Sequence, residues 1–160
     1  MKTTLCIIVL FTVFTFACKS VTKTGNNASM TNDSFTLLSA TSQSWTAGIP
    51  GGGSGTEYYF NVKIKTSRQL LFDSAWINDS AFKIFLAKDK TPVSSEPITF
   101  SKGDTITLRV SELIHQNTHT TSAKPPINFT GAALLSYMVK DKPAYFIIKE
   151  ITRLPSLNRQ

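Results

Sequence analysis

Two histidines, His115 and His119, are the only imidazoles in the 160-residue chain, and they lie four positions apart. On a helix this spacing would place both rings on one side, where imidazole nitrogens can bind zinc or copper, and Glu112 could supply a third ligand. However, the segment Ile114 to Pro126 (IHQNTHTTSAKPP) is rich in Thr and ends in a Pro pair, which favours an irregular connection in which the two rings need not converge. We therefore expect a polar loop without a metal, and metal binding is the alternative.

The same histidines could act in acid–base catalysis only with a carboxylate within hydrogen-bond reach, and Glu112 and Asp104 are the candidates. The ten acidic residues are spread over predicted turns and outward strand positions, so no carboxylate pair of the glycosidase type is recognised. No cofactor motif is recognised either. The sequence therefore favours a non-enzymatic protein. The alternative is a ligand-binding or hydrolytic site between this histidine loop and a glycine-rich loop.

That glycine-rich loop is the segment Trp45 to Thr56 (WTAGIPGGGSGT), which lies between two predicted strands. Glycines permit positive φ and close backbone approach, and successive N–H groups in such a loop can bind an anion. The segment has no G-x-x-x-x-G-K-[ST] motif and no following helix, and Ser54 does not stand in G-x-S-x-G, so neither a nucleotide site nor a hydrolase elbow is indicated. Two interpretations remain. The segment is a structural loop through which the chain changes sheets, or it is part of a ligand or partner surface, with Trp45 stacking on a sugar or capping the core.

Loops held on a rigid scaffold carry binding sites more often than the strands that support them. We therefore predict that the histidine loop and the glycine-rich loop form the candidate ligand or partner surface. Its residues are Trp45, Gly51, Gly52, Gly53, Ser54, Gly55, His115 and His119.

The N-terminal segment has the features of an export signal. A short positive region precedes an apolar run from Leu5 to Phe16, which is shorter than the ~20 residues that a membrane-spanning helix needs. The following Thr15-Phe16-Ala17-Cys18 resembles the bacterial lipobox, and this resemblance implies that Cys18 is lipidated and becomes the N-terminus. Cleavage would remove Cys6 and leave one cysteine. We predict a lipoprotein signal peptide at residues 1–17 and an acyl anchor in membrane lipid. The alternatives are an ordinary cleaved signal peptide, with Cys18 an incidental thiol, or an uncleaved N-terminal anchor.

Residues 18–32 comprise the lipidated cysteine and a segment rich in Ser, Thr, Asn and Lys, which predicts a flexible tether. No acidic run of the surface-export type follows Cys18, and Lys19 differs from the aspartate that retains some lipoproteins at the inner membrane. The lipobox resemblance therefore favours the cell envelope at the outer membrane, on the periplasmic side rather than the surface.

Residues 33–160 have a hydrophobic period of two, which predicts one β domain. In Thr56 to Thr66, Tyr58, Phe60, Val62 and Ile64 fall on one face, whereas the opposite face carries Glu57, Tyr59, Asn61, Lys63 and Lys65. Thr105 to Ser111 repeats this scheme. Further strands are predicted at Phe35–Thr41, Leu70–Ile77, Phe82–Ala87, Pro97–Phe100, Ala132–Val139 and Tyr145–Leu154.

Turn signals separate these segments. They lie at Asn78-Asp79, Asp89 to Pro92, Lys102 to Asp104 and Asp141 to Pro143. No long segment has helical spacing. About eight short strands with tight turns predict an all-β fold, an antiparallel β-sandwich that is immunoglobulin-like in the loose sense, although the Cys, Trp, Cys framework of antibody domains is absent. A small β-barrel is the alternative.

The chain is basic, with a formal net charge of +7 that falls to +6 once Lys2 is removed with the signal peptide. Basic side chains at outward positions predict a solvated face that protects sheet edges, and the alternative is that they face lipopolysaccharide phosphates, acidic glycans or anionic headgroups. These side chains are Lys63, Lys65, Lys83, Arg109, Lys140, Lys142, Lys149 and Arg153. Nucleic acid is not an expected partner outside the cytoplasm, whereas an envelope protein or a glycan is.

The stretch from Trp45 to Leu154 contains the successive segments W-T-A-G-x-x-G-G-G-S-G, Y-Y-F-N-V-K-I, F-D-S-A-W-I-N, F-S-K-G-D-T-I-T-L-R and G-A-A-L-L-S-Y. This succession resembles a group of small uncharacterised lipoproteins from Bacteroidetes. The resemblance implies a lipobox and a β domain, and it implies no activity, ligand or functional residue. The expected function is therefore that of an interaction or accessory module attached by lipid in the cell envelope.

Overall fold

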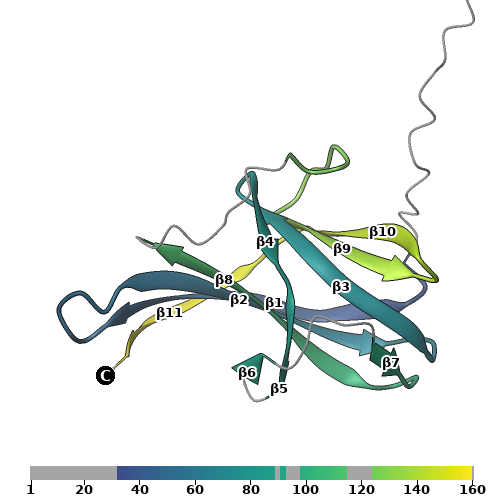
Figure 1. The fold of residues 1–160 in the computed structure, drawn as a ribbon, viewed down its shortest axis with the longest axis horizontal. Helices are drawn as coiled ribbons and strands as arrows, with labels where there is room; N and C mark the ends of the chain where they lie inside the picture. The colour runs from purple at the N-terminus through teal and green to yellow at the C-terminus, as the bar shows by residue number, and fades with distance from the viewer. Residues whose placement is uncertain (1–31, 89–90, 93–97, 115–123, 160) are drawn as a thin grey trace, which may run out of the picture.

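The computed structural model describes residues 32–88, 91–92, 98–114 and 124–159. The regular secondary structure within these ranges consists entirely of β-strands, which form two sheets (Figure 1). The described ranges therefore contain no helix that could cross a membrane. Cys18, the predicted signal peptide and nearly all of the predicted tether lie outside the described residues, as do His115 and His119.

The larger sheet has six strands. In spatial order they are β11 (Thr152–Arg159), β1 (Phe35–Ala47), β2 (Ser54–Ile64), β8 (Thr105–Ile114), β5 (Phe85–Lys88) and β6 (Thr91–Pro92). The first and last strands of the chain, β1 and β11, run parallel, and the other neighbours in this sheet are antiparallel. This arrangement brings the C-terminal strand to one edge of the sheet.

The second sheet has five strands, all paired in antiparallel fashion. Four of them follow the order β10 (Lys142–Ile148), β9 (Ala133–Val139), β3 (Arg68–Ile77) and β4 (Ser80–Lys83), and β7 (Ile98–Phe100) also pairs with β3. The two sheets remain separate and neither closes on itself. The predicted β-sandwich is therefore confirmed, and the alternative of a small β-barrel is wrong for the described residues.

The core between the sheets is built from the inward positions of alternating strands. Phe35, the first residue of β1, is buried in this core, with its ring centroid 5.4 Å from Phe72, 5.1 Å from Tyr137 and 5.2 Å from Phe146. These three partners come from β3, β9 and β10, so one side chain of the six-stranded sheet contacts three strands of the other. Such offset and edge-on aromatic pairs add stabilisation to the burial of apolar area.

Two predicted strands are each divided by a change of sheet. Within the predicted strand Phe82–Ala87, Ile84 separates β4 in the five-stranded sheet from β5 in the six-stranded sheet. Ile84 is 1% exposed, and its N–H donates to the carbonyl of Asp73 at 2.9 Å. The predicted strand Tyr145–Leu154 likewise contains the end of β10 and the beginning of β11. The prediction of a single strand was wrong in both places. Neither crossing contains Gly or Pro, so the sequence carries no sign that the strand is interrupted there.

The turns follow their predicted positions in part. Asn78 and Asp79 have φ of 49° and 61°, as expected for a two-residue hairpin turn, and Gly103 has φ of 98°. The turn between β9 and β10 is centred on Lys140 and Asp141, whereas Lys142 and Pro143 belong to β10. Prediction from Pro143 was wrong because the proline lies at the start of a strand at the edge of its sheet, where its missing N–H is tolerated. Thr91-Pro92, predicted as part of a turn, form β6.

One end of the six-stranded sheet extends past the five-stranded sheet (Figure 1). This end carries the β1–β2 hairpin, the last residues of β8 and the last residues of β11. In agreement with that position, all eight residues of β11 are exposed, and Ile114 at the end of β8 is 47% exposed. This end of the sheet therefore packs little against the rest of the sandwich.

Candidate functional site

Side chains on the six-stranded sheet alternate between the core and the opposite surface, which we call the outer face. Along β2, Tyr58 and Phe60 point into the core, so Glu57, Tyr59 and Asn61 lie on the outer face. The register aligns two rows across β1, β2 and β8, namely Thr41, Tyr59 and Arg109, and Ser39, Asn61 and Thr107. The centre of the outer face is therefore a polar surface laid over an apolar core.

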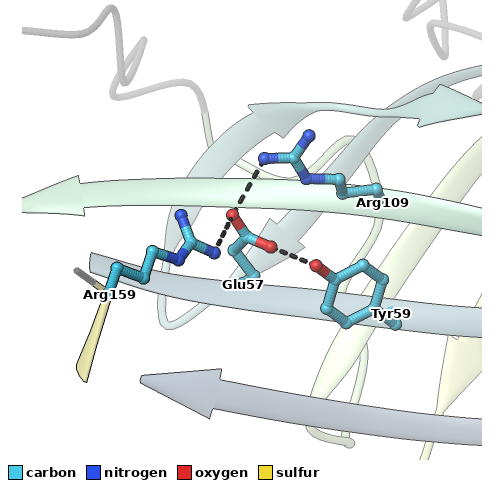
Figure 2. A network of polar contacts seen from close by, with 4 residues as sticks. All are labelled: Glu57, Tyr59, Arg109 and Arg159. Atoms are coloured by element: carbon cyan, nitrogen blue, oxygen red, sulfur yellow. Dashed lines mark hydrogen bonds and ion pairs between the residues drawn. The ribbon is translucent and has the colours of Figure 1, made fainter. Parts of the chain in front are cut away.

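Glu57 is the centre of a polar network on this face (Figure 2). Its side chain is only 5% exposed, and its Oε1 accepts hydrogen bonds from Nη2 of Arg109 and Nη2 of Arg159, each at 2.8 Å. The hydroxyl of Tyr59 donates to the other oxygen, Oε2. Three strands thus contribute to the network, because Glu57 and Tyr59 come from β2, Arg109 from β8 and Arg159 from β11. Arg109, predicted as part of a solvated basic face, is instead an ion-pair partner.

The electrostatics of this network keep Glu57 ionised. Burial raises the pKa of Glu57, but hydrogen bonds from Tyr59, Arg159 and Arg109, together with the charge of Arg109, outweigh it and leave the pKa below its ordinary value. For Tyr59, burial and the hydrogen bond to the Glu57 carboxylate raise the pKa to about 12. At neutral pH the network therefore consists of a carboxylate, two guanidinium groups and a neutral phenol.

Trp45 lies beside the network, and its ring is in contact with Arg159 and close to Gly55. The guanidinium carbon of Arg159 is 4.3 Å from the centroid of the Trp45 ring. On β2, Gly55 lies so close to the indole that a Cβ there would be 3.0 Å from Trp45 Nε1. Trp45 is not part of the core cluster, and its buried Nε1 has no hydrogen-bond partner within the described ranges. Trp45 thus holds β11 against the sheet. The interpretation that Trp45 caps the core was therefore wrong. Arg159 covers a surface of the ring on which a sugar would otherwise stack.

Next to the network, an open depression of about 380 Å³ crosses the outer face. Its lining comes from five strands, in the order Leu154 (β11), Thr41 and Gln43 (β1), Tyr59 and Asn61 (β2), Thr107 (β8) and Ala87 (β5). Because neighbouring strands are about 4.8 Å apart, five strands extend over about 19 Å. We call this depression the transverse groove, since it runs across the strands rather than along them.

Hydrogen bonds within the protein hold the polar side chains of the transverse groove in place. Asn61 donates from Nδ2 to Ser39 Oγ at 2.9 Å and accepts from Thr107 Oγ1 at 2.7 Å. Gln43 donates from Nε2 to the carbonyl of Pro155 at 2.9 Å, at the point where the register of β11 shifts against β1. The groove is therefore fixed in shape by bonds between β1, β2, β8 and β11.

No protein-family model matches this chain, and no curated protein is similar to it in sequence.

The glycine-rich loop forms the β1–β2 hairpin at the extended end of the six-stranded sheet. Its two strands are antiparallel neighbours, so the interpretation that the chain changes sheets there was wrong. Gly51 and Gly53 have φ of 79° and 81°, which L side chains rarely adopt, and a Cβ on Gly52 would clash with that of Ala47. The glycines thus have a structural role in a tight turn, and Gly55 belongs to β2.

The register brings the end of the glycine-rich loop next to the beginning of the histidine loop, because Ser54 pairs with Ile114, the first residue of that loop. The carboxylates considered for catalysis do not converge. Glu112 accepts from Tyr58 Oη at 2.9 Å, whereas Asp104 accepts from the N–H of Ser101 at 2.8 Å. Asp104 precedes β8 and Glu112 is near its end, about 27 Å away for an extended strand. Among the described residues, no three His, Cys, Asp or Glu side chains are grouped as metal ligands.

Sequence reasoning missed the residues that organise the outer face, namely Glu57, Arg159, Gln43 and Asn61. Alternation had placed Glu57, Tyr59 and Asn61 on one face, which is where they lie, but it could not indicate that Glu57 is buried. A signal was present in Glu57 and Asn61, an acidic and an amide residue that flank the aromatic run Tyr58-Tyr59-Phe60 at outward positions of the same strand. For Arg159 no local signal existed, because its partner is 102 positions away.

Proposed function

We propose that this chain is a lipid-anchored lipoprotein of the cell envelope that acts as a non-enzymatic binding module. Cys18 carries the acyl anchor, the tether spaces the β-sandwich from the outer membrane on its periplasmic side, and the outer face of the six-stranded sheet contacts another envelope component. The observation that carries this proposal is the transverse groove, a polar depression whose side chains are held by internal hydrogen bonds.

A fixed polar groove supports a binding role because binding then orders few side chains. Immobilising a mobile side chain at an interface costs about 1 kcal/mol, and Asn61, Gln43 and Tyr59 are already held by Thr107, Pro155 and Glu57. Glu57, the carboxylate beside the groove, is held ionised by two arginines, which supports a binding role rather than acid–base catalysis on this face. Glu112 lies on the opposite face of the sheet, bonded to Tyr58.

The anchor is tested by fractionating cells that produce the full chain or its Cys18→Ala variant. We expect the wild-type chain in the membrane fraction, with diacylglycerol and acyl mass on the N-terminal peptide, and the variant in the soluble fraction. An unmodified Cys18 thiol in membrane-bound protein would contradict the anchor.

The binding role is tested by cross-linking in intact cells followed by purification of the tagged chain. The Gln43→Ala/Asn61→Ala variant removes two amides from the transverse groove, and Asn128→Ala serves as a matched control because Asn128 lines a different cavity, beside Asn78 and Asp79. We expect the groove variant to lose cross-linked envelope components that the control retains. Identical components in all three samples would refute a role for this face.

A further inference from the structure

The transverse groove combines uncharged hydrogen-bonding groups with apolar surface. Thr41, Gln43, Asn61 and Thr107 supply hydroxyl and carboxamide groups, and the Tyr59 ring and Leu154 supply apolar surface. Hydroxyl and carboxamide groups each both donate and accept hydrogen bonds. No side chain that lines the groove carries a charge at neutral pH. The ionised groups of the adjoining network, Glu57 and its two arginines, pair with one another.

The groove side chains retain hydrogen-bonding capacity after their internal bonds are made. A carboxamide has two N–H donors and an oxygen with two lone pairs. Within the described residues, Asn61 uses one N–H and one lone pair, and Gln43 uses one N–H. Thr107 donates its proton to Asn61 and keeps its oxygen as an acceptor. The internal bonds therefore orient these groups and leave donors and acceptors for a ligand.

Tyr59 contributes a ring that is held along the sheet. Residues 57 and 59 are neighbours on the same face of β2, so the bond from the Tyr59 hydroxyl to Glu57 makes the ring lean along the strand (Figure 2). Tyr59 is partly exposed and lines the groove. A ring fixed in this way can pack against the C–H face of a pyranose without loss of side-chain freedom.

The position of the groove favours a sugar over an extended peptide as its ligand. A peptide that binds by extending a sheet needs the free backbone groups of an edge strand. The groove crosses β1, β2 and β8, whose backbone groups are paired with neighbours on both sides. Recognition there depends on side chains alone, and their uncharged, hydroxyl-matching character suits a polyhydroxylated ligand.

We propose that the transverse groove binds a neutral oligosaccharide, with a sugar ring against Tyr59 and its hydroxyl groups bonded to Gln43, Asn61 and Thr107. This inference rests on the proposed function, because it names the chemical class of the envelope component that the outer face contacts. The groove length of about 19 Å corresponds to several linked sugars rather than a single one.

The test is isothermal titration of the purified lipidated chain, in a detergent without a sugar headgroup, with hexasaccharide probes. The neutral probes are cellohexaose, laminarihexaose, mannohexaose, maltohexaose and chitohexaose, and the charged probe is a hexamer of galacturonate. We expect saturable binding of at least one neutral probe and weaker binding of the charged one. The Gln43→Ala and Asn61→Ala variants should each weaken this binding about tenfold.

Matched variants distinguish a ring contact from a change of fold. Tyr59→Phe keeps the ring but removes the bond to Glu57 that holds it, so it should weaken binding of the neutral probe only slightly, whereas Tyr59→Ala should lose most of the binding. Lys63→Ala, at the next outward position of β2 after Asn61, lies outside the groove and should bind as the wild type does. Circular dichroism confirms that each variant is folded.

Three outcomes overturn the inference: no binding of any neutral probe, tighter binding of the galacturonate hexamer, or binding that is unchanged in Gln43→Ala and Asn61→Ala. If no neutral probe binds while cross-linking in cells still depends on Gln43 and Asn61, the proposal of an oligosaccharide ligand is wrong and the proposal of a binding module is retained. If cross-linking is also unchanged, both proposals are wrong.

Discussion

Arg159 and Glu57 are separated by 102 positions in the sequence, and Nη2 of Arg159 donates to Oε1 of Glu57 at 2.8 Å. The same guanidinium lies over the Trp45 ring, and the carbonyl of Arg159 accepts from the N–H of Gly48 at 2.6 Å. One residue therefore fastens the end of β11 to both β1 and β2. Because β11 supplies Leu154 to the transverse groove, this contact also fixes a wall of the candidate site.

The first prediction concerns the buried carboxylate. Glu57→Ala removes the shared acceptor of two arginines and a phenol, and removing one partner of a buried ion pair should lower the free energy of unfolding by about 3 kcal/mol. Urea unfolding followed by circular dichroism measures this loss. The control is Glu150→Ala, an exposed position between β10 and β11, which should change stability by less than about 0.5 kcal/mol. Equal midpoints for the two variants would contradict the role assigned to Glu57.

A second prediction concerns the attachment of β11. Arg159→Ala removes an ion pair and a cation–π contact at a partly exposed site, so the loss of stability should be modest, about 1 kcal/mol. The effect should be local. Amide hydrogen exchange in β11 should accelerate while exchange in β2 and β8 stays slow. Arg153→Ala, on the opposite face of the same strand, is the control, and an equal acceleration in that variant would argue against the contact.

The third prediction is a stability change in acid. Because the pKa of Glu57 in the folded chain is below its ordinary value of 4.5, its ionisation stabilises the fold above pH 4.5, and this contribution is lost as the pH falls through the folded pKa. The wild-type chain should therefore lose stability below pH 4.5 more steeply than Glu57→Gln, which has no proton to take up. Thermal unfolding at a series of pH values measures both slopes. Parallel curves would show that Glu57 does not contribute.

The fourth prediction concerns the close packing of Gly55. A Cβ at this position would overlap the carbonyl oxygen of Glu112 on β8 and crowd the Trp45 ring on β1. Gly55→Ala should therefore cost about 2 kcal/mol, because the β8 backbone at Glu112 must shift and the Trp45 ring must move. Ser54→Ala, one position earlier, is the matched control and should be nearly neutral. A neutral Gly55→Ala would show that the strands can separate there without cost.

The alternation of side chains predicted the layers of the fold well. Tyr58, Phe60, Val62 and Ile64 were assigned to one face, and all four are buried in the core. Such local patterns suffice where a strand has one face on the core and one away from it. They fail where the chain passes between sheets, because Ile84 and Ile151 look like any other apolar residue in a strand.

The candidate site was less predictable than the fold, for a physical reason. The nominated loops were chosen for unusual composition, and the glycine-rich loop proved to be a tight hairpin. By contrast, the transverse groove is assembled from ordinary strand residues of β11, β1, β2, β8 and β5. Which of these strands become neighbours is decided by the packing of the whole chain, so no short segment could indicate that Gln43, Asn61 and Thr107 share a surface.

The parallel pairing of the first and last strands has a mechanical consequence. The beginning of β1 and the end of β11 lie at opposite ends of this strand pair, whose register runs from Thr41 opposite Thr152 to Ala47 opposite Arg159. Tension applied between residue 32 and residue 159 would pull the two strands lengthwise past each other. Their hydrogen bonds would then have to break together rather than one after another, so the sandwich should resist stretching along this axis far better than peeling across it.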